Sequence, residues 1–256
     1  MRSSPIPPCQ PFSASTRASH KTDADTHLAA TRVERRVPAV VRSALGCATP
    51  ITAGVRDHPG MATAWFLGAM SPYSWFAAER IGTLLPDAEW RPLFAGGVFK
   101  AHGRVSWGLT DDRATKIADC EARARVRGLG SIRWPGPWPT NDLLIARAMM
   151  FAQRRDALKR FALTAMRMAF VEGLDLGELT AVRAVADRTG LAGDEVVEAV
   201  SDAEIKTALW AANNEAVAIG VFGVPTVSVG TTLFWGDDRL EEAAAFADRP
   251  QASSAD

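Results

Sequence analysis

The chain has 256 residues, 47% of them hydrophobic, and its 29 basic residues balance its 29 acidic ones. This length suits one large domain or two small ones, and the hydrophobic content is ample for a buried core. Charge balance argues against a dedicated nucleic-acid binder, and the lack of an apolar run of ~18 residues argues against a membrane span.

The first 60 residues differ in composition from the rest. All eight Trp and the single Tyr lie after Met61, and Phe12 is the one aromatic residue before it. Such a segment buries too little apolar area to offset its ordering entropy, so residues 1–60 are predicted to be disordered. They lack the apolar core of a secretory signal, and a true start at Met61 explains them more simply than a functional leader. Residues 249–256 are predicted to form a flexible tail.

Cysteine usage points to a reducing compartment. Cys9 and Cys47 lie in this N-terminal segment, which leaves Cys120 alone in the body of the chain. One cysteine cannot form an intramolecular disulfide, and no C-x-x-C motif occurs, so a cytoplasmic location is expected. No cluster of His, Cys and carboxylates has metal-ligand spacing, so no metal is expected.

Residues 63–96 are predicted to form a β-α-β unit. The run TAWFLG (63–68) is rich in β-formers, SPYSWFAAERIGTLL (71–85) places apolar residues at helical spacing, and AEWRPLFAG (88–96) is a second strand. Such a unit implies a parallel strand pair joined by a right-handed crossover.

From about residue 110 to 220 the pattern is helical. Amphipathic segments, several with cap-like starts, are expected at 111–130, 141–155, 156–173, 175–190, 192–202 and 203–220. Between the first two lies a Pro- and Trp-rich loop, SIRWPGPWPT. Trp134 and Trp138 of this loop pack the helices or roof an aromatic pocket.

The C-terminal part returns to strands. VPTVSVG (224–230) and TTLFWG (231–236) flank Gly230 as a hairpin, and DDRLEEAAAFAD (237–248) is a helix with an acidic first turn.

This element order predicts the α/β class with thioredoxin topology. Residues 61–109 and 205–248 would form the thioredoxin-like domain, and residues 110–204 an inserted helical domain between its βαβ and αββα halves.

Ser71 and Pro72 begin the first predicted helix. Ser is a favoured N-cap and Pro a favoured first helical residue, so capping alone accounts for the pair. The free amides and the positive end of the dipole could also stabilise a thiolate, on the protein or on a ligand. A thioredoxin fold places its redox cysteines at this turn, but here Ser71 and Ser74 stand there. A protein disulfide oxidoreductase is therefore disfavoured.

Two later segments also have a structural and a functional interpretation. Pro225 in FGVPT is an ordinary edge-strand proline, or it forms a cis bond with Val224 that exposes the Val224 backbone to an extended ligand. Asp237 and Asp238 cap the last helix, or they bind a ligand ammonium group while the helix amides hold a carboxylate.

Together and in this order, the SPYSW string, the GVPT turn and the closing FWGDDRLE resemble one family. It is the DsbA-like group of 2-hydroxychromene-2-carboxylate isomerases and kappa-class glutathione transferases. The resemblance covers roughly residues 62–248, the helical insertion included. It implies a glutathione-dependent enzyme that acts on a hydrophobic or aromatic electrophile.

The resemblance also implies roles for individual residues. Ser71 would hydrogen-bond the sulfur of glutathione or another low-molecular-weight thiol. Val224, before Pro225, would pair with the cysteinyl backbone, and Asp237 and Asp238 would meet the γ-glutamyl end.

Lys100 matches a lysine that precedes a K-x-x-G-N run in this family. Here the run ends in Arg104 rather than Asn, and the prolines that follow it are absent. This departure allows a different thiol or a different acceptor. His102, in the same segment, is interpreted as a surface or packing residue.

The leading hypothesis is a thiol-dependent isomerase of the 2-hydroxychromene-2-carboxylate isomerase type, which works by reversible thiolate addition to a conjugated substrate. A kappa-type glutathione transferase and a non-catalytic thioredoxin-fold binding module are the alternatives. No nucleic-acid or membrane partner is expected. The substrate, the thiol and a homodimeric state stay open.

Overall fold

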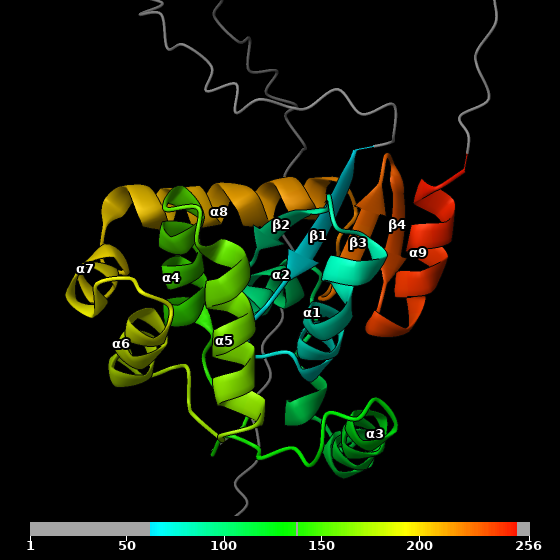
Figure 1. Ribbon diagram of the computed structural model, residues 1–256, viewed down its shortest axis with the longest axis horizontal. Helices are drawn as coiled ribbons and strands as arrows, with labels where there is room; N and C mark the ends of the chain where they lie inside the picture. The colour runs from blue at the N-terminus through cyan, green and yellow to red at the C-terminus, as the bar shows by residue number, and fades with distance from the viewer. Residues whose placement is uncertain (1–61, 137, 250–256) are drawn as a thin grey trace, which may run out of the picture. The chain divides into compact units, whose positions relative to one another are not determined.

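The computed structural model describes residues 62–136 and 138–249 (Figure 1). The expectations for residues 1–60 and for the tail beyond Arg249 lie outside these residues. Among the helices described, none is both long and apolar enough to span a membrane.

A four-stranded sheet with the order β2-β1-β3-β4 forms the centre of the fold. Its strands are β1 (Thr63–Leu67), β2 (Glu89–Pro92), β3 (Thr226–Val229) and β4 (Thr232–Trp235). β1 runs parallel to β2, whereas β3 is antiparallel to both β1 and β4. The parallel pair and the hairpin around Gly230 agree with the sequence-based prediction.

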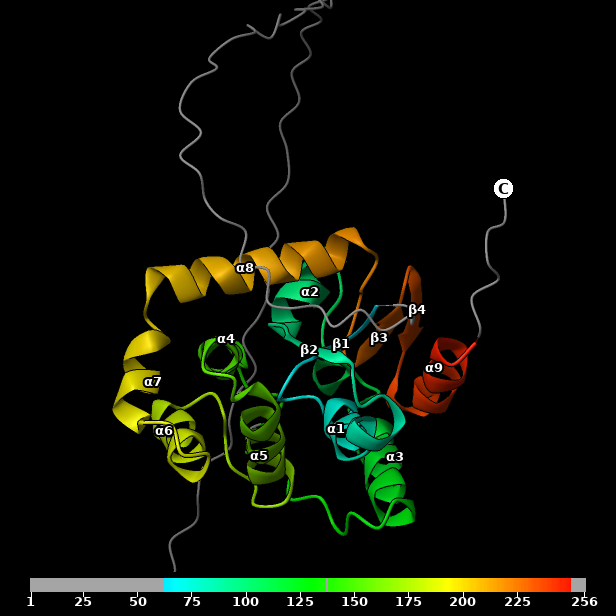
Figure 2. The same ribbon diagram turned by 45° about the horizontal axis from the view of Figure 1, so that its top comes forward.

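Alternating side chains of β1 separate two hydrophobic cores. Trp65 and Leu67 enter the core that contains α1 (Pro72–Leu84) and α9 (Leu240–Ala247). Phe66 enters the smaller core under α2 (Ala95–Ala101) and α8 (Ala203–Ala218). Since successive strand residues point to opposite faces, helices cover both faces of the sheet, as Figure 2 shows for α1 and α8.

The segment between the two halves of the sheet is helical. Its helices are η1 (Trp107–Leu109), α3 (Arg113–Val126), α4 (Leu143–Arg154), α5 (Leu158–Phe170), α6 (Leu179–Arg188) and α7 (Gly193–Ala199). In Figure 1, α4 to α7 gather beside the β2 edge of the sheet, and α9 lies beyond β4. A β-α-β unit, a helical insertion and a β-hairpin followed by a helix make a thioredoxin-like α/β fold.

The second strand is shorter than predicted, and the last residues of the predicted strand form the start of a helix. The prediction extended it to Gly96, but β2 stops at Pro92 and α2 begins at Ala95. Leu93 still donates its amide hydrogen to the Leu67 carbonyl at 2.8 Å, and Gly97 then donates to the Phe94 carbonyl at 3.0 Å. The two adjacent glycines lie in the first turn of α2 and do not terminate a strand.

The cap-like starts expected for two of the inserted helices are also wrong. Ala157 and Glu178 precede α5 and α6, and neither caps its helix through its side chain. At α4 the side-chain oxygen of Asn141 accepts from the Leu143 amide at 3.0 Å, as a cap does. Asp142, which lies between them, bonds to a different element, as described below. Packing of apolar faces therefore stabilises these helices more than their ends do.

We predict that Phe170→Ala lowers the free energy of unfolding by about 3–5 kcal/mol, as expected for a large side chain lost from a core. Phe170 is fully buried, and its ring stacks on Trp75 of α1 with centroids 5.7 Å apart. Urea unfolding measures the loss. Val171→Ala is the matched control because that neighbour is 43% exposed, and an equal loss in both variants would contradict the assigned core.

Candidate functional site

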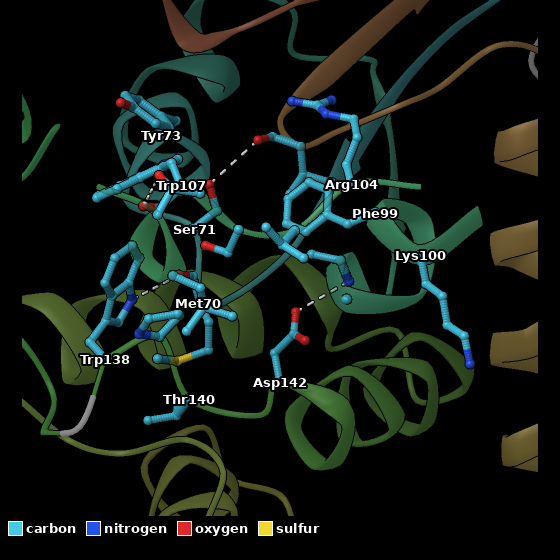
Figure 3. A pocket seen from close by; sticks show the side chains of 18 of the residues that line it. Met70, Ser71, Tyr73, Phe99, Lys100, Arg104, Trp107, Trp138, Thr140 and Asp142 are labelled. Atoms are coloured by element: carbon cyan, nitrogen blue, oxygen red, sulfur yellow. Dashed lines mark hydrogen bonds between the residues drawn. The ribbon is translucent and has the colours of Figure 1, made fainter. Parts of the chain in front are cut away.

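A cavity of about 760 Å³ opens between the start of α1, helix α2, the turn before β3 and the segment that precedes α4 (Figure 3). Its wall is mostly apolar. The aromatic residues that line it are Tyr73, Phe94, Phe99, Trp107, Trp138 and Trp235. Its charged residues are Lys100, Arg104, Asp112 and Asp142. A concave apolar surface with a few polar groups is typical of a small-molecule site.

Ser71 lies in this cavity at the start of α1. Its Oγ accepts a hydrogen bond from the amide of Ser74 at 3.2 Å, which makes it the N-cap. The same hydroxyl donates to the Val224 carbonyl at 3.5 Å, a contact drawn in Figure 3. Because α1 has 13 residues, its unpaired first-turn amides and positive dipole end favour an anion beside Ser71.

Val224 forms the opposite side of this contact. It is buried and lines the cavity, and the Val224–Pro225 peptide bond is cis. Within the described residues, the Val224 amide has no hydrogen-bond acceptor. Pro225 is buried outside the cavity lining, and its carbonyl accepts from the Gly236 amide at 2.9 Å. The turn therefore leaves one backbone donor unused at a residue that lines the cavity.

Lys100 and Arg104 bring positive charge to the rim of the cavity. Lys100 lies in the last turn of α2, and Figure 3 shows its side chain extending away from Ser71. Arg104 donates to the Phe222 carbonyl at 3.0 Å, and its guanidinium lies 5.4 Å from the centroid of the Phe222 ring. Cation–π contacts of this kind hold a guanidinium in place and leave its charge available.

Asp237 and Asp238, which were expected to meet a ligand, do not line this cavity. Asp237 is fully buried in an ion-pair network with Arg123 of α3 and with Arg127, which directly follows α3. Burial, together with the positive charges of Arg80 and Arg123, lowers the pKa of Arg127 to about 10. Asp238 is exposed. Asp237 therefore joins the start of the last helix to α3.

His102 and Cys120 both lie outside the cavity lining. The His102 ring is 3.1 Å from the Val221 carbonyl through Nε2, which agrees with a packing role. Cys120 is fully buried, and burial raises the pKa of its thiol to about 11. This thiol is therefore neutral near pH 7 and inaccessible as a nucleophile.

Two residues of the cavity, Trp107 and Asp142, were not singled out from the sequence, whereas Trp138 was expected to pack the helices or to roof an aromatic pocket. Trp107 packs against Trp138 with ring centroids 4.6 Å apart, so Trp138 both packs the insertion and lines the cavity. Asp142 is only 6% exposed, and its Oδ2 accepts from the Ala95 amide at 3.2 Å. Burial raises the pKa of Asp142 to about 6, although the amides of Ala95 and Gly96 oppose this shift.

Over the stretches 62–136 and 138–249, no group of three or more His, Cys, Asp or Glu side chains is arranged to hold a metal ion. The cavity offers a helix start, the Ser71 hydroxyl, two cations and two carboxyl groups beside an aromatic wall.

We predict that Asp142→Asn changes how stability depends on pH. A carboxyl pKa raised from 3.8 to about 6 in the folded state contributes stability that is complete below pH 4 and is lost as the pH rises through 6. The variant has no carboxyl group at this position and does not lose stability in this way. The unfolding free energy of the variant minus that of wild type should therefore be about 3 kcal/mol larger at pH 7 than at pH 4. Denaturant unfolding at both pH values measures this difference, and equal differences would contradict the shifted pKa.

Comparisons with known proteins agree with this architecture. The family of DsbA-like thioredoxin domains matches residues 64–246. Over 94 residues the chain is 30% identical to a 2-hydroxychromene-2-carboxylate isomerase from Sphingobium xenophagum, which is 37% of this chain and about half (48%) of that relative.

Two solved structures share the fold. A 2-hydroxychromene-2-carboxylate isomerase gives a TM-score of 0.64 at 18% identity, over 73% of this chain and 94% of that one. A probable DsbA oxidoreductase from Streptomyces coelicolor gives 0.57 at 17% identity, over 77% and 94%. With most of its described residues matched, the chain belongs to the family of DsbA-like thioredoxin domains.

Proposed function

We propose that this protein is a thiol-dependent isomerase of the 2-hydroxychromene-2-carboxylate isomerase type, with glutathione or a related low-molecular-weight thiol as its cofactor. The observation that carries the proposal is the position of Ser71. Its hydroxyl lies at the start of α1, 3.5 Å from the Val224 carbonyl, in a cavity with aromatic walls. A thioredoxin-fold redox enzyme needs cysteine at this turn.

The absence of cysteine at the turn requires the reacting sulfur to come from a ligand. Disulfide exchange proceeds through a mixed disulfide, which neither Ser71 nor Ser74 can form. Cys120 cannot substitute, since it is buried with a pKa of about 11. A bound thiol would supply a nucleophilic sulfur that adds reversibly to a conjugated carbon and leaves unchanged.

The residues around Ser71 suit such a thiol. The Ser71 hydroxyl can turn from the Val224 carbonyl to donate to the sulfur, and the positive end of α1 favours the thiolate form. The free amide of Val224 can pair with a peptide-like backbone. Lys100 and Arg104 can bind carboxylates of the same ligand. Because Asp237 is paired with Arg123 and Arg127, the exposed Asp238 is the better candidate of the two aspartates expected to meet the γ-glutamyl end.

The aromatic wall suits a hydrophobic, planar electrophile. Tyr73, Trp107 and Trp138 line the side of the cavity next to Ser71. The Trp138 indole donates to the Met70 carbonyl at 3.3 Å, which fixes its ring beside the start of α1. Flat rings stack on such walls and exclude water from the reacting carbon. Since a free thiol has to stay reduced, the cytoplasm is the compartment that suits this activity.

A kappa-type glutathione transferase would use the same groups and is the second candidate. In the isomerase the sulfur of the bound thiol leaves the product, whereas in the transferase it stays bonded to the product. A non-catalytic binding module would keep the fold and the cavity without turnover.

We predict that reduced glutathione raises the melting temperature of the full-length protein. A ligand at 100 times its dissociation constant stabilises the native state by about 2.7 kcal/mol. Thermal shift with reduced glutathione, cysteine and S-methylglutathione measures the effect and its dependence on a free thiol. Failure of every free thiol to raise the melting temperature would contradict the proposal.

We also predict that Ser71→Ala raises the pKa of the bound thiol. Loss of the cap alone costs ~1 kcal/mol of stability. Loss of the hydroxyl donor should in addition shift the ultraviolet absorbance of the bound thiolate to higher pH. Each unit of this shift corresponds to about 1.4 kcal/mol. Turnover near neutral pH should fall by more than the stability loss explains.

Asp202→Ala is the matched control for the loss of a cap. Asp202 caps α8 by accepting from the amides of Glu204 and Ile205, and it lies outside the cavity lining. This variant should lose similar stability with an unchanged thiol pKa. An unchanged thiol pKa in Ser71→Ala as well would reduce Ser71 to a cap.

A further inference from the structure

The first turn of α2 forms part of the cavity wall, and side chains from other elements bond to its start. Phe94, which precedes the helix, provides no side-chain cap. Two buried polar side chains from other elements bond to consecutive residues there. They are Asn213 of α8 and Asp142, which precedes α4, 119 and 47 residues away from their partners.

Asn213 pairs with Phe94 as a neighbouring strand would. Its Oδ1 accepts from the Phe94 amide at 3.0 Å, and its Nδ2 donates to the Phe94 carbonyl at 2.8 Å. Gly97 makes room for this amide group, because an added Cβ there would lie 2.8 Å from Nδ2. Both backbone groups of Phe94 are thus satisfied by one side chain.

Asp142 holds the next residue from the cavity side. Its Oδ2 accepts from the Ala95 amide at 3.2 Å, and Figure 3 shows its carboxyl group inside the ring of cavity residues. A carboxylate is a stronger acceptor for a backbone amide than a neutral group is. Asn213 and Asp142 therefore fix the two residues from which α2 starts.

No counter-ion accompanies Asp142. The surrounding segments contribute Gly68 to Ser71, Val224 and the first turn of α4, all uncharged, and α8 contributes the neutral Asn213. The charged residues that share the cavity are Lys100 in the last turn of α2, Arg104 beyond its end, and Asp112. Among the described residues, none of them forms an ion pair with Asp142. Burying a carboxylate in this way is unfavourable, so its presence in a cavity wall indicates a functional requirement.

We propose that Asp142 and Asn213 are positioning residues that fix helix α2 and, through it, the thiol-binding side of the cavity. Helix α2 carries Phe99 and Lys100 along the cavity and leads into Arg104. The predicted effect of Asp142 on thiol affinity rests on the proposed function. Its predicted effect on the stability of the first turn of α2 does not. Because burial raises the pKa of Asp142 to about 6, its carboxyl group becomes neutral, and a weaker acceptor for the Ala95 amide, as the pH falls from 8 to 5, even though burial of the neutral form costs less overall stability.

The test of the helix uses full-length Asp142→Leu and Asp142→Asn, with Asp202→Asn as the matched control. Asp202 likewise accepts from backbone amides at a helix start, but it is exposed and outside the cavity lining. Hydrogen exchange of the peptide covering residues 94–98, at pH 8, should be about tenfold faster in Asp142→Leu. It should be less affected in Asp142→Asn, which keeps an acceptor oxygen, and unchanged in the control. Unchanged exchange in Asp142→Leu would overturn the proposal, even if Asp142→Asn behaves as wild type.

The test of the site uses calorimetric titration with glutathione between pH 5 and 8. Asp142→Leu should weaken binding about tenfold at pH 8. Wild-type affinity should fall through pH 6 more steeply than that of Asp142→Asn, a difference that a purely structural residue would not produce. Faster exchange with unchanged glutathione affinity would also overturn the proposal. If wild type binds no glutathione at any pH, the proposed function fails, and hydrogen exchange alone decides the role of Asp142 in holding α2.

Discussion

The candidate site depends on a close approach of three backbone segments around Gly68. A Cβ atom at this position would lie 3.1 Å from Cγ2 of Val224 and 3.2 Å from Cβ of Ala95. Both distances are too short for an ordinary contact, so glycine allows the end of β1, the start of α2 and the turn before β3 to meet. The Ser71 amide then donates to the Gly68 carbonyl at 3.1 Å, which sets the start of α1 beside Val224. The contact between the Ser71 hydroxyl and Val224 follows from this arrangement.

Two buried aspartates illustrate different uses of charge in this fold. Asp237 lies between Arg123 and Arg127, so its charge is compensated and it joins two elements of the structure. Asp142 bonds to a backbone amide and has no cation, so its carboxylate costs stability near neutral pH. The compensated aspartate lies outside the cavity and the uncompensated one lies within it. This contrast is the physical basis for assigning a functional role to Asp142.

Substitution of serine for cysteine changes the chemistry that a thioredoxin-like fold can perform. The helix start that stabilises a protein thiolate in a redox enzyme remains in place, with a hydroxyl where the sulfur would be. The polar features of the turn can then act on a sulfur from a bound thiol. The aromatic wall supplied by η1 and the Trp-rich loop gives the second reactant an apolar surface. The helix start belongs to the thioredoxin-like part and the aromatic wall to the helical insertion, so neither part alone forms the site.

Local patterns in the sequence determined the elements of this protein, because strand and helix periodicity, caps and turn residues are encoded within a few neighbouring positions. The β-α-β unit, the hairpin at Gly230, the inserted helices and the cap at Ser71 were all predictable on this basis. Tertiary structure alone decided which polar groups meet. Asp142 could be interpreted only as a cap of its own helix, since its partner Ala95 is 47 residues away. Nothing in the sequence around Asp237 indicated that Arg123 and Arg127 would be its partners. The predicted strand 88–96 ended early because Asn213 bonds to Phe94, where α2 begins. Long-range pairings of this kind leave no periodic signal in the chain, and they arise only when the helices pack.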